Sequence, residues 1–284
     1  MVQTQFMSRF HCPLCDSIST IRFVVADYPI LDCEICGHRF SPYISGSSNI
    51  MDVYGDEYFT GGGAGYPDYA AESIRLVRRG RGYARKLKTF LKTGRLLDIG
   101  AANGSILQGF IEEGWRGIGL EPNATMAASG KAEYGLDIQT GDLESFDSVE
   151  RFDLITMIQV VAHFHDPKTA FKNAKRILDR NGHLLIETWD RDSITAKVLG
   201  KHWHEYSPPS VLHWFSRRSL KDFLGNEGFD EVYSGRTLKS ISGTHAKSLL
   251  KYRLGDLQLL RLMPDRISFP YPSEDLFWAL YRKR

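Results

Sequence analysis

Between residues 95 and 188 the sequence alternates apolar, strand-like segments with amphipathic, helix-like ones, and this alternation restricts the fold more than any other feature. A repeated order of strand, helix and strand is typical of a parallel sheet with helices on both faces. We therefore expect an α/β fold whose ligands bind at the carboxyl ends of the strands. The expected strands are 95–99, 117–120, 137–140, 152–158, 183–188, 231–234 and 275–281, and the expected helices are 105–113, 124–134, 167–178 and 219–227.

The composition excludes several classes of protein. With 284 residues, of which 42% are hydrophobic and 25% charged, the chain can hold one full-sized domain and a small module. It contains no apolar run long enough to span a membrane, and its first ten residues lack the basic and apolar regions of a secretory signal. We therefore expect a cytoplasmic protein. The net charge of +2 is too balanced for a dedicated nucleic-acid binder.

All the cysteines of the chain lie near its start, and they form two C-x-x-C pairs separated by seventeen residues. This spacing is typical of a tetrahedral zinc site, and a cytosolic chain keeps its thiols reduced, which argues against disulfides. His11 and His38 flank the pairs and are weaker candidates for ligands. The sequence thus predicts a structural Zn²⁺ ion. Its expected ligands are Cys12, Cys15, Cys33 and Cys36.

Three segments are expected along the chain. Residues 1–45 are expected to form a zinc ribbon, because a strand-like segment at 21–25 lies between the cysteine pairs and so small a module needs its metal to fold. Residues 46–70 are rich in Gly, Ser, Tyr and Pro and are expected to form a linker or a lid. Residues 71–284 are expected to form the α/β domain.

The segment 71–93 combines apolar residues at helical spacing with many arginines and lysines. The favoured interpretation is a helix that packs ahead of the first strand of the domain and exposes its basic face to solvent. A nucleic-acid-binding face is the alternative.

A turn rich in small residues, at 98–104, joins the first predicted strand of the domain to the helix that follows. Small side chains there let the backbone approach a ligand closely at a helix N-terminus. Such a turn is weak evidence alone, but acidic residues follow the next two strands, where Glu121 can accept ribose hydroxyls and Asp142 can meet an adenine amino group. The candidate cofactor-binding residues are Asp98, Gly100, Ala102, Gly104, Glu121, Asp142 and Gln159.

This series of strand ends resembles the class I S-adenosylmethionine (SAM) dependent methyltransferases over residues 71–284. The resemblance implies a Rossmann-like, seven-stranded α/β domain behind the zinc ribbon, with SAM as the cofactor. A Rossmann dehydrogenase would need a Gly-x-Gly-x-x-Gly turn, which residues 100–105 do not supply. The roles implied are the methionine part of SAM for Asp98, Gly100 and Gly104, the ribose for Glu121 and the adenine for Asp142.

The sequence departs from the family pattern at two positions. Ala102 stands where the turn usually has a glycine, and we expect the binding geometry to differ most there. Ala162 stands where a small-molecule branch of the family has a glutamate, directly before His163.

Methyl transfer from a sulfonium requires alignment and a deprotonated nucleophile, so a single general base suffices. His163 is the first candidate base, because its pKa lies near working pH, and a structural role at the following helix is the alternative. His213 is the second candidate, because it resembles a family histidine that precedes Phe-Ser and faces the active site. It lies in an aromatic, histidine-rich segment, 189–215, that is expected to cover the substrate.

The chain is therefore expected to be a SAM-dependent methyltransferase that methylates a hydroxyl of a sugar, polysaccharide or natural product. C-methylation of a keto-sugar, methylation of a ribosomal RNA base and a non-catalytic, SAM-binding adaptor are the alternatives. The expected partner is a small-molecule or sugar substrate, and neither nucleic acid nor a membrane is expected. The sequence makes no prediction about the oligomeric state.

Overall fold

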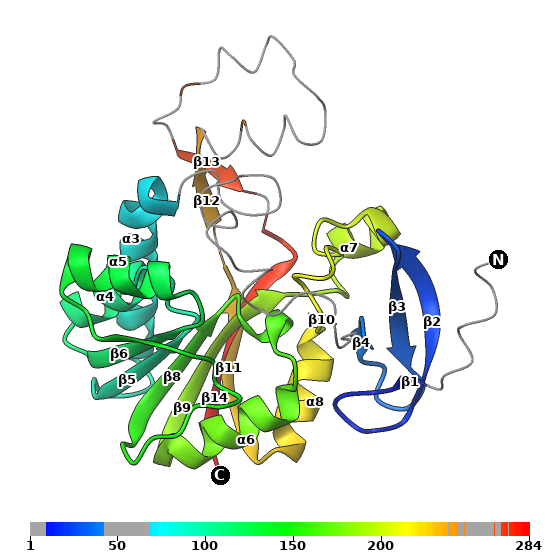
Figure 1. Ribbon diagram of the computed structural model, residues 1–284, viewed down its shortest axis with the longest axis horizontal. Helices are drawn as coiled ribbons and strands as arrows, with labels where there is room; N and C mark the ends of the chain where they lie inside the picture. Colours follow the sequence, from blue (N-terminus) through cyan, green and yellow to red (C-terminus); the bar gives the residue numbers. More distant parts are fainter. Residues whose placement is uncertain are drawn as a thin grey trace.

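The computed structural model describes residues 10–42, 69–237, 239–243, 268–271 and 273–284, together with residues 247 and 264. It contains an α/β domain and, beside it, the cysteine-bearing N-terminal module, drawn in blue in Figure 1. The predicted linker or lid, 46–70, lies outside the described residues except for its last two.

A seven-stranded sheet forms the centre of the α/β domain. Its strands are β5 (Arg95–Ile99), β6 (Arg116–Glu121), β7 (Ile138–Thr140), β8 (Phe152–Ile158), β9 (Leu178–Trp189), β11 (Phe229–Arg236) and β14 (Leu276–Lys283). They lie in the order β11, β14, β9, β8, β5, β6, β7. The five strands from β9 to β7 are parallel, and β14 runs antiparallel to both β9 and β11. The predicted seven-stranded α/β fold is confirmed.

Helices cover both faces of this sheet (Figure 1). One face carries α3 (Tyr69–Leu87), α4 (Ser105–Glu112) and α5 (Ala124–Tyr134), and the other carries α6 (Pro167–Ile177) and α8 (Arg217–Asn226). Successive side chains of a strand point to opposite faces. Leu96 accordingly packs in the cluster that contains α3 and α4, whereas Leu97 packs in the cluster that contains α6 and α8. The continuous apolar runs in the sequence arise because both faces are buried.

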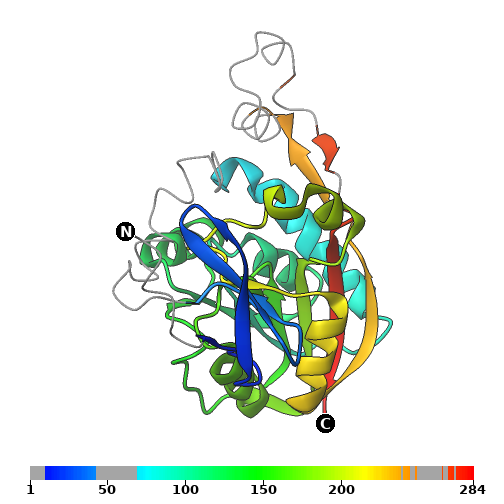
Figure 2. The same ribbon diagram turned by 90° about the vertical axis from the view of Figure 1, so that its right-hand side faces the viewer.

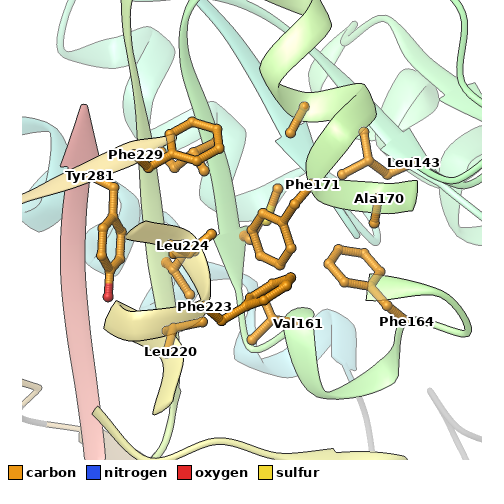
Figure 3. Close-up of a cluster of buried hydrophobic side chains, with 14 of the residues drawn as sticks. Leu143, Val161, Phe164, Ala170, Phe171, Leu220, Phe223, Leu224, Phe229 and Tyr281 are labelled. Atoms are coloured by element: carbon orange, nitrogen blue, oxygen red, sulfur yellow. The ribbon is translucent and has the colours of Figure 1, made fainter. Parts of the chain in front are cut away.

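The core beneath α6 and α8 is aromatic, as Figure 3 shows. Phe171 of α6 makes edge contacts with Phe223 of α8 and with Phe164, at centroid distances of 5.5 and 5.9 Å. Val161 and Phe164 both reach this core from the turn after β8. That turn is therefore fixed to the core on both sides of Ala162 and His163.

Local sequence explains where the helices begin. The side chain of Asn123 accepts a hydrogen bond from the amide of Met126 at the start of α5. Asp166 caps α6 ahead of Pro167, which occupies a position where a missing N–H costs nothing. Ser216 forms a reciprocal cap with Ser219 at the start of α8.

The N-terminal module is a small antiparallel sheet. Its strands are β1 (Phe10–His11), β2 (Ile18–Val25), β3 (Tyr28–Cys33) and β4 (Arg39–Phe40). Ala26 and Asp27 form the two-residue turn between β2 and β3, with φ angles of 46° and 68°. Two positive φ angles are the conformation of a type I′ hairpin, whose twist matches that of its strands.

The sheet of this module continues into the α/β domain. The short strand β10 (His213–Trp214) pairs antiparallel with β4, so a five-stranded sheet runs in the order β1, β2, β3, β4, β10. Figure 2 shows the blue strands lying along the side of the domain. Arg39 and Arg191, one from each part, both contact Asp32, with N–O distances of 2.6 and 3.6 Å. The sequence analysis did not predict β10.

The segment 189–215 buries several of its aromatic rings against the cysteine module. It contains α7 (Ile194–Leu199) and η2 (Gly200–His202), and its rings at Trp203, Tyr206 and Trp214 share a buried cluster with Ile30 of β3. The sequence analysis predicted a cover over the substrate here, whereas most of these aromatic rings are core. The apolar contacts of the module account for the difference, because they give the rings a surface to pack against.

Beyond β11, the strand β12 (Lys239–Ser242) pairs with β13 (Ser268–Tyr271). Within the described part of the chain, no helix is both long and apolar enough to cross a membrane.

Candidate active site

The turn between β5 and α4 requires glycine at two of its positions. Gly100 and Gly104 have φ angles of 64° and 76°, which side chains rarely adopt. A Cβ atom at Gly100 would lie 2.6 Å from a methyl of Val160, and one at Gly104 would lie 2.4 Å from a methyl of Leu136. The two glycines therefore keep the backbone of the turn close to its neighbours.

Ala102 is the centre of this turn and adopts the left-handed conformation, with a φ of 48°. Its amide donates a hydrogen bond of 2.8 Å to Oε2 of Glu121, the last residue of β6. Oε1 of the same carboxylate accepts from the amide of Asn123 at 2.9 Å. Each carboxylate oxygen has a second lone pair, so Glu121 can still accept the two hydroxyls of a ribose.

Asp98 and Glu121 are both buried, and their pKa values are raised. Burial raises the pKa of Asp98 to about 7, although a hydrogen bond of 2.5 Å from the hydroxyl of Thr156 lowers it. Burial also raises the pKa of Glu121, while the amides of Asn123 and Ala102 lower it. Two desolvated acids at one strand edge favour a cationic or hydroxyl-bearing ligand.

Asp142 follows β7 and lies at the same edge of the sheet, because Thr140 of β7 pairs with Glu121 of β6. Its Oδ1 accepts hydrogen bonds from the amide and the hydroxyl of Ser145, at 2.8 and 2.7 Å. The charge of Asp142 also raises the pKa of His165, which burial lowers more strongly. The loop after β7 thus lies beside the loop after β8.

Gln159 directly follows β8 and connects it to a buried carboxylate. Its φ of 61° is unusual for a residue other than glycine, its amide donates to the carbonyl of Glu187, and its Nε2 donates to Oε1 of Glu187 at 3.1 Å. Glu187 is fully buried in β9 and also accepts from Arg79 and Tyr83 of α3 and from Thr237. These contacts fix the side chain of Gln159 at the end of the strand.

The sequence analysis missed the cluster around Glu187. A glutamate inside the apolar segment 183–188 was the available signal, because a buried carboxylate requires a charged or hydrogen-bonding partner. The partner residues could not be identified from the sequence, since Arg79 lies 108 positions away.

His163 lies in the turn η1 (Val161–His163), directly after β8. Its Nδ1 lies 2.6 Å from the carbonyl oxygen of Ser210, so Nδ1 carries a proton and donates. Burial lowers the pKa of His163, while the carbonyls of Ser210 and Gln159 raise it by a smaller amount. The ring is therefore neutral at pH 7, with Nε2 as its basic nitrogen.

His213 is buried in β10, and both of its ring nitrogens are used. Nε2 donates to the carbonyl of Phe164 at 2.8 Å, and Nδ1 lies 3.1 Å from Nε2 of His38. Burial lowers the pKa of His213 to about 4. His213 therefore accepts from His38, and a substrate proton could reach its Nδ1 only after that hydrogen bond breaks.

The four cysteines form one cluster, in which all the sulfur atoms lie within 4.8 Å of one another. Two cross-pair distances are 3.6 Å, between Cys12 and Cys36, and 3.4 Å, between Cys15 and Cys33. Zn–S bonds of about 2.3 Å in a tetrahedron separate sulfur atoms by about 3.8 Å, so the set fits zinc. His11 and His38, the weaker candidates, are not part of the cluster.

Basic side chains at the C-terminal end of α3 and just after it pair with the carboxylates of Glu112, the last residue of α4, and of Glu113, which follows it. Arg81 pairs with Glu112, and both Arg85 and Lys88 pair with Glu113, the last two at N–O distances of 2.8 Å. This pairing reduces the free positive charge that a phosphate backbone would need.

A sequence model of the family described as the methyltransferase domain matches residues 72–234, which is more than half of the chain. This chain belongs to that family. The matched region is a class I SAM-dependent methyltransferase domain. The strand ends that carry Asp98, Glu121 and Asp142 lie inside the matched region, whereas the four-cysteine cluster precedes it.

Curated relatives of the methyltransferase include ubiquinone biosynthesis O-methyltransferases. The protein from Rhodopseudomonas palustris (strain BisB5) is 26% identical over 130 residues, which cover 43% of this chain and 49% of that protein. The protein from Azorhizobium caulinodans is 28% identical over 182 residues, or 59% of this chain and 69% of that protein. The chain thus spans about half the length of the first of these relatives.

Solved structures share the fold of the methyltransferase. A SAM-dependent methyltransferase from Thermotoga maritima superposes with a TM-score of 0.51 at 19% identity and covers 83% of this chain and 98% of its own. The magnesium protoporphyrin IX methyltransferase from Synechocystis PCC 6803, with bound SAH, superposes with a TM-score of 0.50 at 14% identity. The match covers 76% of this chain and 88% of that one. At these identities the likeness concerns the fold alone.

Proposed function

We propose that this methyltransferase transfers the methyl group of SAM to a hydroxyl oxygen of a small-molecule acceptor, such as a sugar, a polysaccharide unit or a natural product, and that His163 is the general base. The observation that carries the proposal is the position of a neutral histidine in the turn after β8, at the edge where the cofactor candidates lie. The curated relatives are O-methyltransferases, which supports oxygen as the accepting atom.

The cofactor residues act by binding and orientation. Glu121 can accept the ribose hydroxyls, Asp142 can meet the adenine amino group, and ionised Asp98 can favour the cationic methionine part. Gln159, fixed by Glu187, can hold the end of β8 against the reacting groups. SAM supplies an electrophilic methyl group when it is bound.

His163 would move a single proton. The acceptor oxygen forms a bond to the methyl carbon as the S–C bond breaks, and Nε2 of His163 takes the hydroxyl proton. The carbonyls of Ser210 and Gln159 favour the protonated ring, so they stabilise the imidazolium that this step produces. His213 is the weaker choice for this role, because its Nδ1 accepts from His38.

The cysteine cluster would hold a structural Zn²⁺ ion through Cys12, Cys15, Cys33 and Cys36. The amides of Leu14 and Cys36 donate to cysteine sulfur atoms at 3.4 Å, which favours the thiolate form that a metal requires. With four protein ligands the ion has no open position for a substrate, which supports a structural role.

His163→Ala tests the proposed base. We expect kcat to fall by about 10² to 10⁴-fold, because a positioned base contributes that much, while the Kd for SAM stays unchanged. The assay is transfer of radioactive methyl from SAM to a panel of sugars and phenols. The same compounds with the hydroxyl already methylated are the matched negative substrates.

A pH profile provides a second readout. At saturating SAM, kcat should rise with pH and level off above an apparent pKa lower than the ordinary histidine value of about 6.5, because burial lowers the pKa of His163. Unchanged kcat in His163→Ala would refute the base, and methyl transfer to carbon or nitrogen alone would refute the proposed acceptor.

A further inference from the structure

Three consecutive residues in the turn after β8, Ala162, His163 and Phe164, are each hydrogen-bonded to the same distant segment. The carbonyl of Ala162 accepts from the amide of Leu212 at 2.9 Å. Nδ1 of His163 donates to the carbonyl of Ser210, and the carbonyl of Phe164 accepts from Nε2 of His213. The segment 210–213 therefore fixes both the ring of His163 and the backbone on either side of it.

The same segment is part of the sheet of the cysteine module. His213 pairs with Phe40 and Trp214 with Arg39, and the amide of Ser41 donates to the carbonyl of Leu212 at 2.9 Å. Leu212 is thus bonded to the module through its carbonyl and to Ala162 through its amide. One connection between the module and the catalytic turn therefore passes through Leu212 alone.

A pair of buried imidazoles forms a second connection. His38 follows the second cysteine pair, and its carbonyl accepts from the amide of the ligand candidate Cys33 at 2.9 Å. Its ring is fully buried and bonds to His213, which in turn bonds to Phe164. Phe215 lies against the His38 ring at a centroid distance of 4.7 Å and keeps it in place.

We infer that the cysteine module helps to build the acceptor side of the active site, by which we mean the turn after β8 that carries the base His163. In this arrangement His38 and His213 are positioning residues that hold His163 through residues 210–213. This inference rests on the proposed role of His163 as the base. Within the described residues, the hydrogen bonds of the cofactor turn run to β6, β8, α3 and α5 and not to the module. Disturbing the histidine pair should therefore lower kcat and leave SAM binding unchanged.

The test compares two substitutions of His213 that have similar volumes. His213→Gln keeps a donor for Phe164 and an acceptor for His38, whereas His213→Leu keeps neither. We expect kcat to fall by about tenfold to a hundredfold in His213→Leu, because misplacing a catalytic group costs this much, and to recover largely in His213→Gln. The Kd for SAM, measured by calorimetry, and the bound zinc should match the wild type in both.

A double-mutant cycle examines the connection from the side of the module. His38→Leu should lower kcat in the same direction, and the double variant H38L/H213L should fall no further than His213→Leu alone, because both substitutions remove the same contact. If His213→Leu does not fold, His38→Leu still tests the pair. His183→Ala is the matched control, since His183 lies in the middle of β9, where it pairs with Leu154 near the start of β8, away from the catalytic edge.

The outcomes separate the inference from the function on which it rests. Wild-type kcat in His213→Leu and His38→Leu, together with a large loss in His163→Ala, would overturn the inference and leave the base in place. A fall in SAM affinity as large as the fall in kcat would also overturn it, because the effect would then be general. Wild-type kcat in His163→Ala would overturn both.

Discussion

The cofactor side and the acceptor side of the catalytic edge are built in different ways. On the cofactor side the candidate residues lie at or near strand ends, and their hydrogen bonds stay within the α/β domain. Glu121 accepts from Asn123 and Asp142 from Ser145, while Asp98 accepts from Thr156 of the neighbouring strand β8. On the acceptor side the turn that carries His163 is bonded to residues 210–213, and His213 is bonded to His38, 175 positions away. The cofactor side is held within the α/β domain, and the acceptor side depends on contacts with the cysteine module.

This difference predicts that a change in the cysteine module affects the two sides of the active site unequally. The turn at 98–104 is held by the parallel pairing of β5 with β6 and β8, which is independent of the cysteine module. The turn at 161–163 shares its hydrogen-bonding partners with that module. A change in the module should therefore lower turnover and leave SAM binding unchanged.

Metal removal should have the largest effect. A structural zinc site contributes about 10 kcal/mol or more to the folding of a small module, so chelation should unfold residues 10–42. Hydrogen exchange should show loss of protection there and in residues 207–216, with protection kept in β5 and β6. Turnover should be lost and SAM binding retained, and both turnover and protection should return when zinc is added. Full protection of the module without metal would contradict the comparison.

Glu121→Ala should have the next largest effect and act on the opposite side. It removes hydrogen bonds from two backbone amides and from the ribose, each worth about 1.5–3 kcal/mol at a charged acceptor, so the affinity for SAM should fall about a hundredfold. Calorimetry measures the loss, and the bound zinc and the exchange protection of residues 10–42 serve as controls. A loss of zinc in this variant would show that the two sides are coupled.

The affinity for SAM should depend on pH through Asp98. Its pKa of about 7 lies above the ordinary value, so the carboxyl is protonated below pH 7, and the cationic cofactor favours the ionised form. Affinity should therefore weaken as pH falls below 7, by up to about tenfold per pH unit. Asp98→Asn should bind SAM more weakly, without this dependence. A flat profile for the wild type between pH 6 and 8 would contradict the prediction.

Ala102→Gly should have the smallest effect. Ala102 has a φ of 48°, and the left-handed conformation costs a residue with a Cβ about 1 kcal/mol. Glycine should raise the free energy of unfolding by roughly this amount, measured by denaturant titration, without weakening SAM binding. Ala101→Gly is the matched control, since Ala101 is buried beside it and its φ is not positive, and this variant should be less stable than the wild type. Equal effects of the two variants would show that strain at Ala102 is unimportant.

Much of the fold could be predicted because its signals are local. Helices α5 and α6 begin directly after Asn123 and Asp166, whose side chains cap their first turns, and the predicted ranges differ from the observed ones by one residue at most. The cofactor candidates could be predicted for the same reason, since parallel strands bring their carboxyl ends to one edge. Their roles in binding SAM remain predictions.

The sequence by itself determined the seven-stranded domain, the cysteine cluster and the residues at the strand ends, because periodicity, capping and ligand spacing act over a few residues. Only the tertiary structure decided that β10 joins the sheet of the module, that Glu187 meets Arg79, and that His213 bonds to His38. These contacts depend on which surfaces become buried together, and a buried polar group takes the partner that folding brings to it.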